Sequence, residues 1–385
     1  MAAAAGCTDS GSAATPTTST AVEPPTTAAP APETTTSAPA TTAPPTSAAP
    51  ATTVPPGPQQ FAVQTVASGL EVPWGLAFLP DGRALVAQRR TGEVLVVDAN
   101  GGTQVVATLP SVDQGEGGLL GLAVPADADP AAPEVYAYLT AGSENQVVRF
   151  TLGQSGVAPV LVGIPAAGNH NGGRIAFGPD GFLYIGTGDA SEDGLAQDQG
   201  SLAGKILRIT RDGQAAPGNP IAGNPLYSFG HRNVQGLAWD AQGRLYATEF
   251  GQNSFDEVNL IQPGANYGWP IVEGQGGDSR FVEPIVTWTT SEASPSGAAI
   301  LSASALPGWD GDLFVAGLRG ARLWRVDLAP DGSVAGQEPL LVGEYGRLRT
   351  VAQAPDGSLW VTTSNRDGRG DPAADDDRIL RLAPA

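Results

Sequence analysis

The stretch that decides the fold is "GRIAFGPDGFLYIGTGD", residues 173–189. It contains an apolar run, a Pro-Asp-Gly turn and a second apolar run rich in Phe, Leu, Tyr and Ile. Short apolar runs bounded by Gly, Pro and Asp are typical of β-strands joined by tight turns. The stretch therefore predicts a strand–turn–strand unit.

This unit recurs along the chain. Its first strand and turn are repeated as "WGLAFLPDG" (74–82), "LGLAVPADA" (120–128), "QGLAWDAQG" (235–243) and "RTVAQAPDG" (349–357), with a weaker copy "SASALPGWDG" (302–311). Each turn is followed by a second and a third apolar strand, as in "FLYIGTGD" and "KILRITRDG". Six copies lie roughly 45–65 residues apart, a period that indicates a β-propeller.

The two ends of the repeat predict how the ring closes. Propeller blades normally hold four strands, but the last copy ends at Ala385 with only three. The unassigned strand "FAVQTVASG" (61–69) would complete that blade. We therefore expect an all-β fold over residues 59–385, a six-bladed β-propeller with four strands per blade, closed by the N-terminal strand.

Residues 1–58 differ from the rest in composition. They hold 12 of the 34 prolines and no aromatic residue. Such a segment cannot bury enough apolar surface to offset its ordering entropy, which predicts a disordered tether. Cys7 in "AAAAGCTDS" looks like the end of a bacterial lipoprotein signal, although the apolar segment that usually precedes it is missing. We expect an extracytoplasmic protein, secreted or lipid-anchored through Cys7 to the outer face of a cell membrane; the alternative is an unmodified thiol.

Charge and cysteine content exclude several classes of protein. The net charge of −19 argues against nucleic-acid binding, because a phosphate-binding surface would have to overcome a repulsive field. The sequence has no apolar run of membrane-spanning length. A single cysteine excludes an internal disulfide and a cysteine-based metal site.

The repeat also predicts where polar residues meet. In a propeller the innermost strand of each blade lines the central channel, so the blades can be aligned on the Ala of that strand. The residues just before it are then Glu116, His170, Arg232, Asn233, Arg347 and Arg349. Loops between the second and third strands open on the same face and add Asp189, Gly251, Gln252 and Arg319. Strand alternation turns His231 away from the channel, and we interpret it as structural.

Two interpretations of this convergence stay open. Four arginines in an acidic domain require either a bound anion or a dense ion-pair network with Glu116, Asp189 and their neighbours. Arginine forks bind carboxylates bidentately, so the first interpretation suggests a ligand with several carboxylates.

Several segments together resemble the soluble quinoprotein glucose/sorbosone dehydrogenase family, across roughly residues 61–385. These are "PWGLAFLPDG", "GEGGLLGLA", "HNGGRIAFGPDGFLYIGTGD", "GHRNVQGLAWD", "TEFGQNSFDEVNLIQPGANYGWP" and "GRLRTVAQAPDG". The resemblance implies oxidation of the anomeric carbon of an aldose to a lactone. The hydride would pass to pyrroloquinoline quinone (PQQ), a flat quinone with three carboxylates, and the electrons to an external acceptor.

The resemblance also implies roles for individual residues. His170 matches the general base, Asp189 the carboxylate that orients it, and Arg232 a residue at the reacting centre. The residues that match cofactor contacts are Glu116, Arg232, Asn233, Arg319, Arg347 and Arg349. The carbonyls of Gly251 and Gln252 match a Ca²⁺ site that polarises the quinone, and Glu257 with the Tyr267 carbonyl matches a second, structural Ca²⁺ site.

The sequence departs from the family pattern at three of these positions. Arg319 stands where glucose-oxidising members have Lys, Glu116 where they have Gln, and Gln252 where they have Pro. A carboxylate at Glu116 would weaken the binding of an anionic cofactor unless it is paired or protonated. The substrate-side loops 190–203 and 263–300 do not align well enough to identify the sugar.

Two other functions compete with the dehydrogenase. One is a non-catalytic cell-surface propeller that binds sugars or a protein partner. The other is a Ca²⁺-dependent lactonase, which four arginines at the channel mouth fit poorly.

Overall fold

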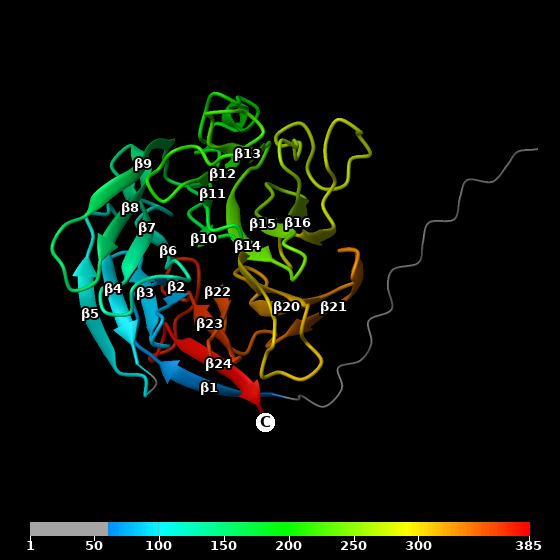
Figure 1. The fold of residues 1–385 in the computed structure, drawn as a ribbon. Helices are drawn as coiled ribbons and strands as arrows, with labels where there is room; N and C mark the ends of the chain where they lie inside the picture. Colours follow the sequence, from blue (N-terminus) through cyan, green and yellow to red (C-terminus); the bar gives the residue numbers. More distant parts are fainter. Residues whose placement is uncertain (1–60, 99) are drawn as a thin grey trace, which may run out of the picture. The chain divides into compact units, whose positions relative to one another are not determined.

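The computed structural model describes residues 61–98 and 100–385. Their strands form six antiparallel four-stranded sheets arranged in a ring, which confirms the predicted six-bladed β-propeller (Figure 1). The one helical segment among these residues is the 3-10 turn Asp193–Ala196. None of the described helices is long and apolar enough to cross a membrane. The predicted tether and Cys7 lie outside the described residues.

The first three blades follow one another in sequence order. Blade one contains β2 (Pro73–Phe78), β3 (Ala84–Gln88), β4 (Glu93–Val97) and β5 (Thr103–Thr108). Blade two contains β6 (Leu119–Ala123), β7 (Glu134–Ala141), β8 (Glu144–Thr151) and β9 (Ala158–Pro165). Blade three contains β10 (Ile175–Phe177), β11 (Leu183–Gly186), β12 (Lys205–Ile209) and β13 (Leu226–Phe229).

The remaining blades complete the ring. Blade four contains β14 (Val234–Trp239), β15 (Leu245–Glu249), β16 (Phe255–Ile261) and β17 (Val286–Thr289). Blade five contains β18 (Pro295–Ile300), β19 (Leu313–Gly317), β20 (Arg322–Leu328) and β21 (Val334–Leu340). Blade six contains β22 (Leu348–Gln353), β23 (Leu359–Thr363), β24 (Ile379–Pro384) and β1 (Phe61–Ala67).

The closing strand lies where the sequence predicts it. β1 pairs antiparallel with β24, with Phe61 opposite Pro384 and Thr65 opposite Leu380. Blade six is thus built from both ends of the described chain, and β1 lies beside β24 in the ribbon (Figure 1).

The turns that define the repeat share one hydrogen-bond pattern. In the Pro-Asp-Gly turns after β2, β10 and β22, the Asp carboxylate accepts the backbone N–H two residues further on, at 3.0–3.2 Å. The glycine that follows has a positive φ of 77–89°, which a side chain would disfavour. The turn of each of these hairpins is therefore specified by its local sequence, independently of contacts between blades.

The hydrophobic core is divided among the interfaces between blades. Each of six buried clusters combines side chains from neighbouring blades, including the pair formed by blades six and one. Every sheet therefore buries its faces against its neighbours, which gives the loops at the channel mouth a rigid support.

One predicted strand is wrong. We expected residues 302–311 to form the inner strand of blade five, but β18 (Pro295–Ile300) has that place. Residues 302–311 form the connection from β18 to β19 instead. The inner strand reads "PSGAAI", whose small residues carry little β-signal, and it lacks the Pro-Asp-Gly turn that marks the other copies.

Candidate functional site

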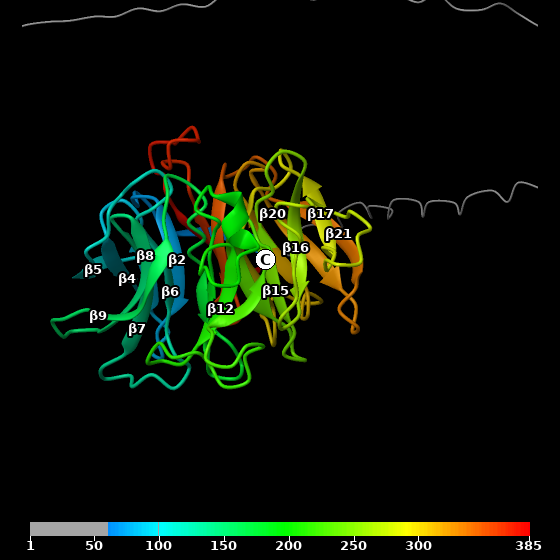
Figure 2. The same ribbon diagram turned by 90° about the horizontal axis from the view of Figure 1, so that it is seen from above.

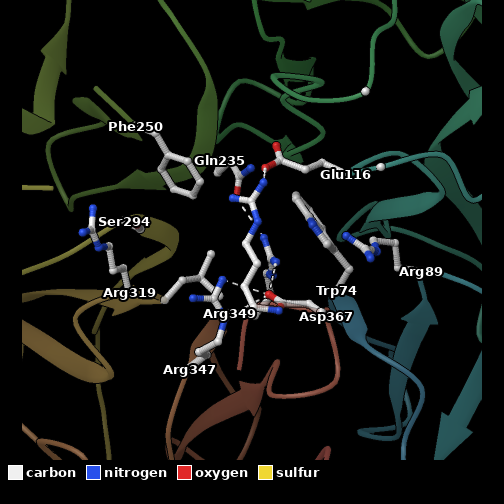
Figure 3. Close-up of a pocket in the computed structure, with 15 residues that line it drawn as sticks. Trp74, Arg89, Glu116, Gln235, Phe250, Ser294, Arg319, Arg347, Arg349 and Asp367 are labelled. Atoms are coloured by element: carbon white, nitrogen blue, oxygen red, sulfur yellow. Dashed lines mark hydrogen bonds and ion pairs between the residues drawn. The ribbon is translucent and has the colours of Figure 1, made fainter. Parts of the chain in front are cut away.

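A cavity of about 490 Å³ opens at the mouth of the central channel (Figure 3). Loops and inner strands from around the whole ring supply its walls, so the cavity exists only in the closed ring. Its polar and aromatic lining residues are Trp74, Arg89, Glu116, Gln235, Phe250, Ser294, Arg319, Arg347, Arg349, Asp367 and Arg369. Five of these eleven residues are arginines, so the lining is rich in positive charge although the chain is acidic.

Arg347 and Arg349 face the same carboxylate, as strand alternation predicts for residues two apart. Asp367 Oδ2 lies 2.9 Å from Arg347 Nη2 and 3.3 Å from Arg349 Nη2 (Figure 3). Burial alone would raise the pKa of Asp367, but the charges of Arg349 and Arg347 hold it below its usual value. Asp367 lies in the loop between β23 and β24, the red loop that rises above one face of the ring in Figure 2.

Trp74, which lines the cavity, contacts two buried guanidinium groups, and one of them, Arg349, also lines the cavity. Arg174 lies 4.2 Å from the centre of the Trp74 ring, and Arg349 lies 5.8 Å from it. Burial and the charge of Arg349 lower the pKa of Arg174 to about 9, and burial lowers that of Arg349 to about 10 despite Asp367. Holding these charges away from water is costly, and an anion in the cavity would relieve that cost.

The remaining charged side chains at the channel mouth have only some of the ion pairs and hydrogen bonds that they could form. Arg369 Nη2 pairs with Glu116 Oε1 at 2.8 Å, which supplies the partner that Glu116 needs beside an anion. Arg319 has one long contact, 3.5 Å to Thr290 Oγ1. The Nε of Arg89 is buried without a hydrogen-bond partner. Buried unpaired donors of this kind are expected where a ligand binds.

His170 and Asp189 form a hydrogen-bonded pair beside this cavity. His170 Nδ1 lies 2.8 Å from Asp189 Oδ1, and Asp189 is fully buried. Asp189 also accepts the Trp269 indole N–H at 2.8 Å and the Ser191 N–H at 2.8 Å. A carboxylate partner on Nδ1 makes that nitrogen the donor and leaves Nε2 as the basic nitrogen.

The pair is held by an unusual backbone. His170 has a positive φ of 57°, which is uncommon for a residue with a side chain. Its backbone N–H donates to Glu116 Oε2 at 3.3 Å, so Glu116 links the histidine to the arginine-lined cavity. A Cβ on the neighbouring Gly188 would collide with the His170 carbonyl, so only glycine fits there.

Arg232 and Asn233 have different environments. The Arg232 guanidinium donates to the Gly251 carbonyl at 2.7 Å and lies 5.2 Å from the centre of the Trp269 ring. The Nε of Arg232 is buried without a partner. Asn233 is fully buried, where Oδ1 accepts the Gly172 N–H at 2.9 Å and Nδ2 has no partner.

Three of the four residues predicted to bind metal line a second, small cavity of about 10 Å³, and the fourth, Gln252, is not among its lining residues. Gly251, Glu257 and Tyr267 line it together with Glu249 and Glu273. Asn259 Nδ2 donates to both Glu249 and Glu257, at 2.8 and 3.1 Å. Burial and the charge of Glu249 raise the pKa of Glu257 above its usual range. Two buried carboxylates that share one amide suit a hard cation.

Side chains alone do not form a cation site. Among the residues that the structure describes, no cluster of three or more His, Cys, Asp or Glu side chains could hold a metal. The Gly251 carbonyl accepts a hydrogen bond from the positively charged Arg232 guanidinium. A metal here would therefore depend on backbone carbonyls as much as on carboxylates.

The structure brings the predicted residues together in two adjacent groups. Arg319, Arg347, Arg349 and Glu116 line the larger cavity, whereas His170, Asp189 and Arg232 lie beside it. His231 turns away as predicted: it is fully buried, bonded to Ser228 and Glu249, and stacked on Tyr267.

Sequence reasoning missed several residues of the site. These are Trp74, Arg89, Arg174, Gln235, Trp269, Glu273, Asp367 and Arg369. A signal existed for two of them: Arg89 and Asp367 follow the second strands of their blades, as Asp189 does in blade three. The other side chains join blades that are far apart in the sequence, and a local repeat does not show such contacts.

Comparison with solved structures gives a close match in fold. The PQQ-bound form of aldose sugar dehydrogenase from Streptomyces coelicolor has a TM-score of 0.78 and 50% identity, covering 85% of this chain and 99% of that chain. The two proteins are therefore similar in sequence as well as in fold.

Characterised sequences agree with this match. An aldose sugar dehydrogenase of Escherichia coli is 28% identical, covering 81% of this chain and 92% of that protein. Quinoprotein glucose dehydrogenase B of Acinetobacter calcoaceticus is 26% identical, covering 83% of this chain and 88% of that protein. The Glucose / Sorbosone dehydrogenase family model matches residues 70–380, and the chain therefore belongs to that family.

Proposed function

We propose that this protein is a quinoprotein aldose dehydrogenase. It would bind PQQ in the arginine-lined cavity and oxidise the anomeric carbon of an aldose to a lactone. The observation that carries the proposal is the His170–Asp189 pair, 2.8 Å apart, beside a cavity lined by five arginines. Membership of the family and the likeness to a PQQ-bound aldose sugar dehydrogenase support it.

The charge of the cavity fits the cofactor. PQQ is flat and carries three carboxylates, and the cavity offers arginines from several sides with Trp74 as an aromatic lining residue. Asp367 neutralises only part of the charge on Arg347 and Arg349, and Arg89 Nε has no partner. Arg347, Arg349 and Arg319 would hold carboxylates, and Arg232 with Asn233 would complete the cofactor contacts.

His170 would act as the general base. When bound, PQQ supplies the two-electron acceptor for the hydride from the anomeric carbon. Asp189 holds Nδ1 of His170, so Nε2 is the atom that takes the proton of the anomeric hydroxyl. Among the described residues, the one side chain bonded to Nε2 is Asn169, at 3.4 Å, a long contact that a sugar hydroxyl could replace. Trp269 and Ser191 keep Asp189 in place during the transfer.

Ca²⁺ would bind at the carbonyls of Gly251 and Gln252, and a second Ca²⁺ at Glu257 and the Tyr267 carbonyl. Oxygen donors of this kind are the ligands that Ca²⁺ prefers. The Gly251 carbonyl accepts the Arg232 guanidinium in the structure, so this side chain would have to turn aside for Ca²⁺ to bind there. A cation beside the cavity would stabilise negative charge that develops in the reaction.

The electrons would leave to an external acceptor. We further propose an extracytoplasmic location, either secreted or attached to a membrane by a lipid on Cys7. Radiolabelled lipid incorporation into the parent and a Cys7→Ser variant would separate these two locations.

The test is reconstitution of the purified protein with PQQ and Ca²⁺. We expect saturable PQQ binding in the cofactor's absorbance spectrum, followed by dye reduction with aldoses. Binding without turnover on a panel of aldoses would favour a non-catalytic propeller, and absence of binding would reject the assignment.

A matched pair of variants tests the cavity itself. Charge-assisted hydrogen bonds contribute roughly 1.5–3 kcal/mol each, so Arg349→Ala should weaken PQQ binding by about ten- to a hundredfold. Arg381→Ala, which removes an arginine paired with Asp356 outside this cavity, should leave PQQ binding unchanged.

A further inference from the structure

The loop that joins β15 to β16 is held by carboxylates through five successive backbone N–H groups, those of residues 251–255. The four N–H groups of residues 252–255 donate to one oxygen, Oε1 of Glu273, at 2.7–3.2 Å. The preceding N–H, of Gly251, donates to Asp256 Oδ1 at 3.0 Å. Successive N–H groups that converge on one anion form a backbone nest.

This arrangement directs the carbonyl groups away from the carboxylates. The carbonyls of Phe250 and Gly251 accept the Arg232 guanidinium, at 3.2 and 2.7 Å. The loop therefore has a negative side chain on its N–H side and a positive group on its carbonyl side. A Cβ at Gly251 would collide with the Phe255 carbonyl, so the tight backbone needs glycine there.

We propose that Glu273 is the positioning residue that sets the cation affinity of this loop. By fixing the backbone of residues 252–255, its carboxylate holds the carbonyl oxygens of Gly251 and Gln252 where a Ca²⁺ ion is bound. This inference rests on the proposed function, in which those carbonyls are metal ligands. Glu273 acts through the backbone and touches none of the reacting groups.

A further observation supports this role. Residues 252–255 are exposed, and no cluster of the hydrophobic core includes them. The Glu273 contacts therefore restrain a segment that no core cluster holds.

Amide hydrogen exchange in the cofactor-free protein tests the restraint. Glu273→Ala should remove the protection of the amides of residues 252–255, while Glu273→Gln, which keeps an acceptor oxygen, should remove part of it. The control is Glu283→Ala, which removes a carboxylate that accepts a single N–H, from Gly277, at an exposed position. Unchanged protection in Glu273→Ala would overturn the proposal.

A Ca²⁺ titration in the presence of PQQ tests the consequence. Removing a side chain that orients metal ligands costs about ten- to a hundredfold in metal affinity, so we expect that loss in Glu273→Ala and none in Glu283→Ala. Parental Ca²⁺ affinity in Glu273→Ala would overturn this inference alone. Absence of Ca²⁺ binding in the parent would overturn the proposed metal site and this inference together.

Discussion

At the scale of single residues, three carboxylates of the site fix the direction of the groups that they contact. Asp189 holds Nδ1 of His170, Asp367 holds Arg347 and Arg349, and Glu273 holds the loop after β15. None of these carboxylates would meet the substrate directly. The groups proposed to act are therefore positioned before any ligand arrives, which is the main way a protein promotes a reaction between bound groups.

The role of His170 is tested by His170→Gln. Removing a positioned general base costs about 10²–10⁴-fold in rate, so turnover of reconstituted protein should fall by that factor. PQQ and Ca²⁺ should still bind, because neither contacts the imidazole in this proposal. Steady-state kinetics and a PQQ titration check the two parts. Parental turnover, or loss of the cofactor, would assign His170 another role.

Asp367→Asn should affect folding and ligand binding in opposite directions. Removing one partner of a buried ion pair costs roughly 3 kcal/mol, so denaturation at pH 7 should show a lower free energy of unfolding. PQQ should bind at least as tightly, because Arg347 and Arg349 lose their counter-ion. A Kd for PQQ that rises strongly in this variant would contradict the proposed cavity charge.

The stability difference between Asp367→Asn and the parent should depend on pH. The pKa of Asp367 is lower in the folded protein than in the unfolded chain, where it is about 3.9. Its contribution is therefore complete above that value and is lost as the pH falls through the folded pKa. Denaturation at pH 7 and pH 3 should show the gap closing. Asp278→Asn, which removes an exposed partner of Arg280, is the matched control and should change little.

The sequence predicts the direction of a side chain where the residues lie on one strand, because alternation along the strand sets that direction. Arg347 and Arg349 were predicted to point the same way because they are two residues apart, and they share Asp367. Trp269 could not be found in this way, because it reaches Asp189 from a loop 80 positions further along the chain. Such a contact depends on how blade four packs against blade three, which no local pattern specifies.

At the scale of elements, the repeat predicted most strands because each hairpin carries its own turn signal. The Asp and Gly of the turn after β10 fix it with contacts inside the hairpin. Blade five shows the limit of this approach. Its inner strand, β18, has small residues and no Pro-Asp-Gly turn, so the repeat pattern wrongly predicts the strand in the connection that follows it.

The element-scale prediction concerns the closing strand. Deleting residues 61–67 removes β1, leaves the edge of β24 unpaired and exposes part of the core between blades five and six, to which Phe61 belongs. The thermal midpoint should fall by several degrees or the protein should fail to fold. Deleting residues 1–58 should leave the midpoint nearly unchanged, as the composition of that segment predicts. Equal losses from both deletions, measured by calorimetry, would contradict this.

At the scale of the whole molecule, stability and ligand binding are linked through the ring. The core lies between blades, so no blade buries its faces alone, and the cavity is lined by Arg89 of blade one and Arg347 of blade six. A ligand that contacts both arginines spans the interface between blades six and one. Ligand binding should therefore stabilise the ring as a unit.

This linkage gives a quantitative prediction. PQQ at a hundred times its Kd should add about 2.7 kcal/mol to the free energy of unfolding, because only the folded ring binds it. Chemical denaturation with and without PQQ measures the difference. Arg349→Ala at the same PQQ concentration should lose most of that gain. An equal gain in the variant would show that PQQ binds elsewhere.

The pairing of β1 with β24 also has a consequence for the order of the chain. Phe61 lies directly opposite Pro384 in an antiparallel pair, so a two-residue Asn-Gly turn could join them covalently. Blade six would then be one continuous meander, and new ends could be opened in a loop between any two other blades. In such a circular permutant the first and last strands would no longer share a blade, and the ring would be closed by packing between two complete blades instead of by strand pairing within one.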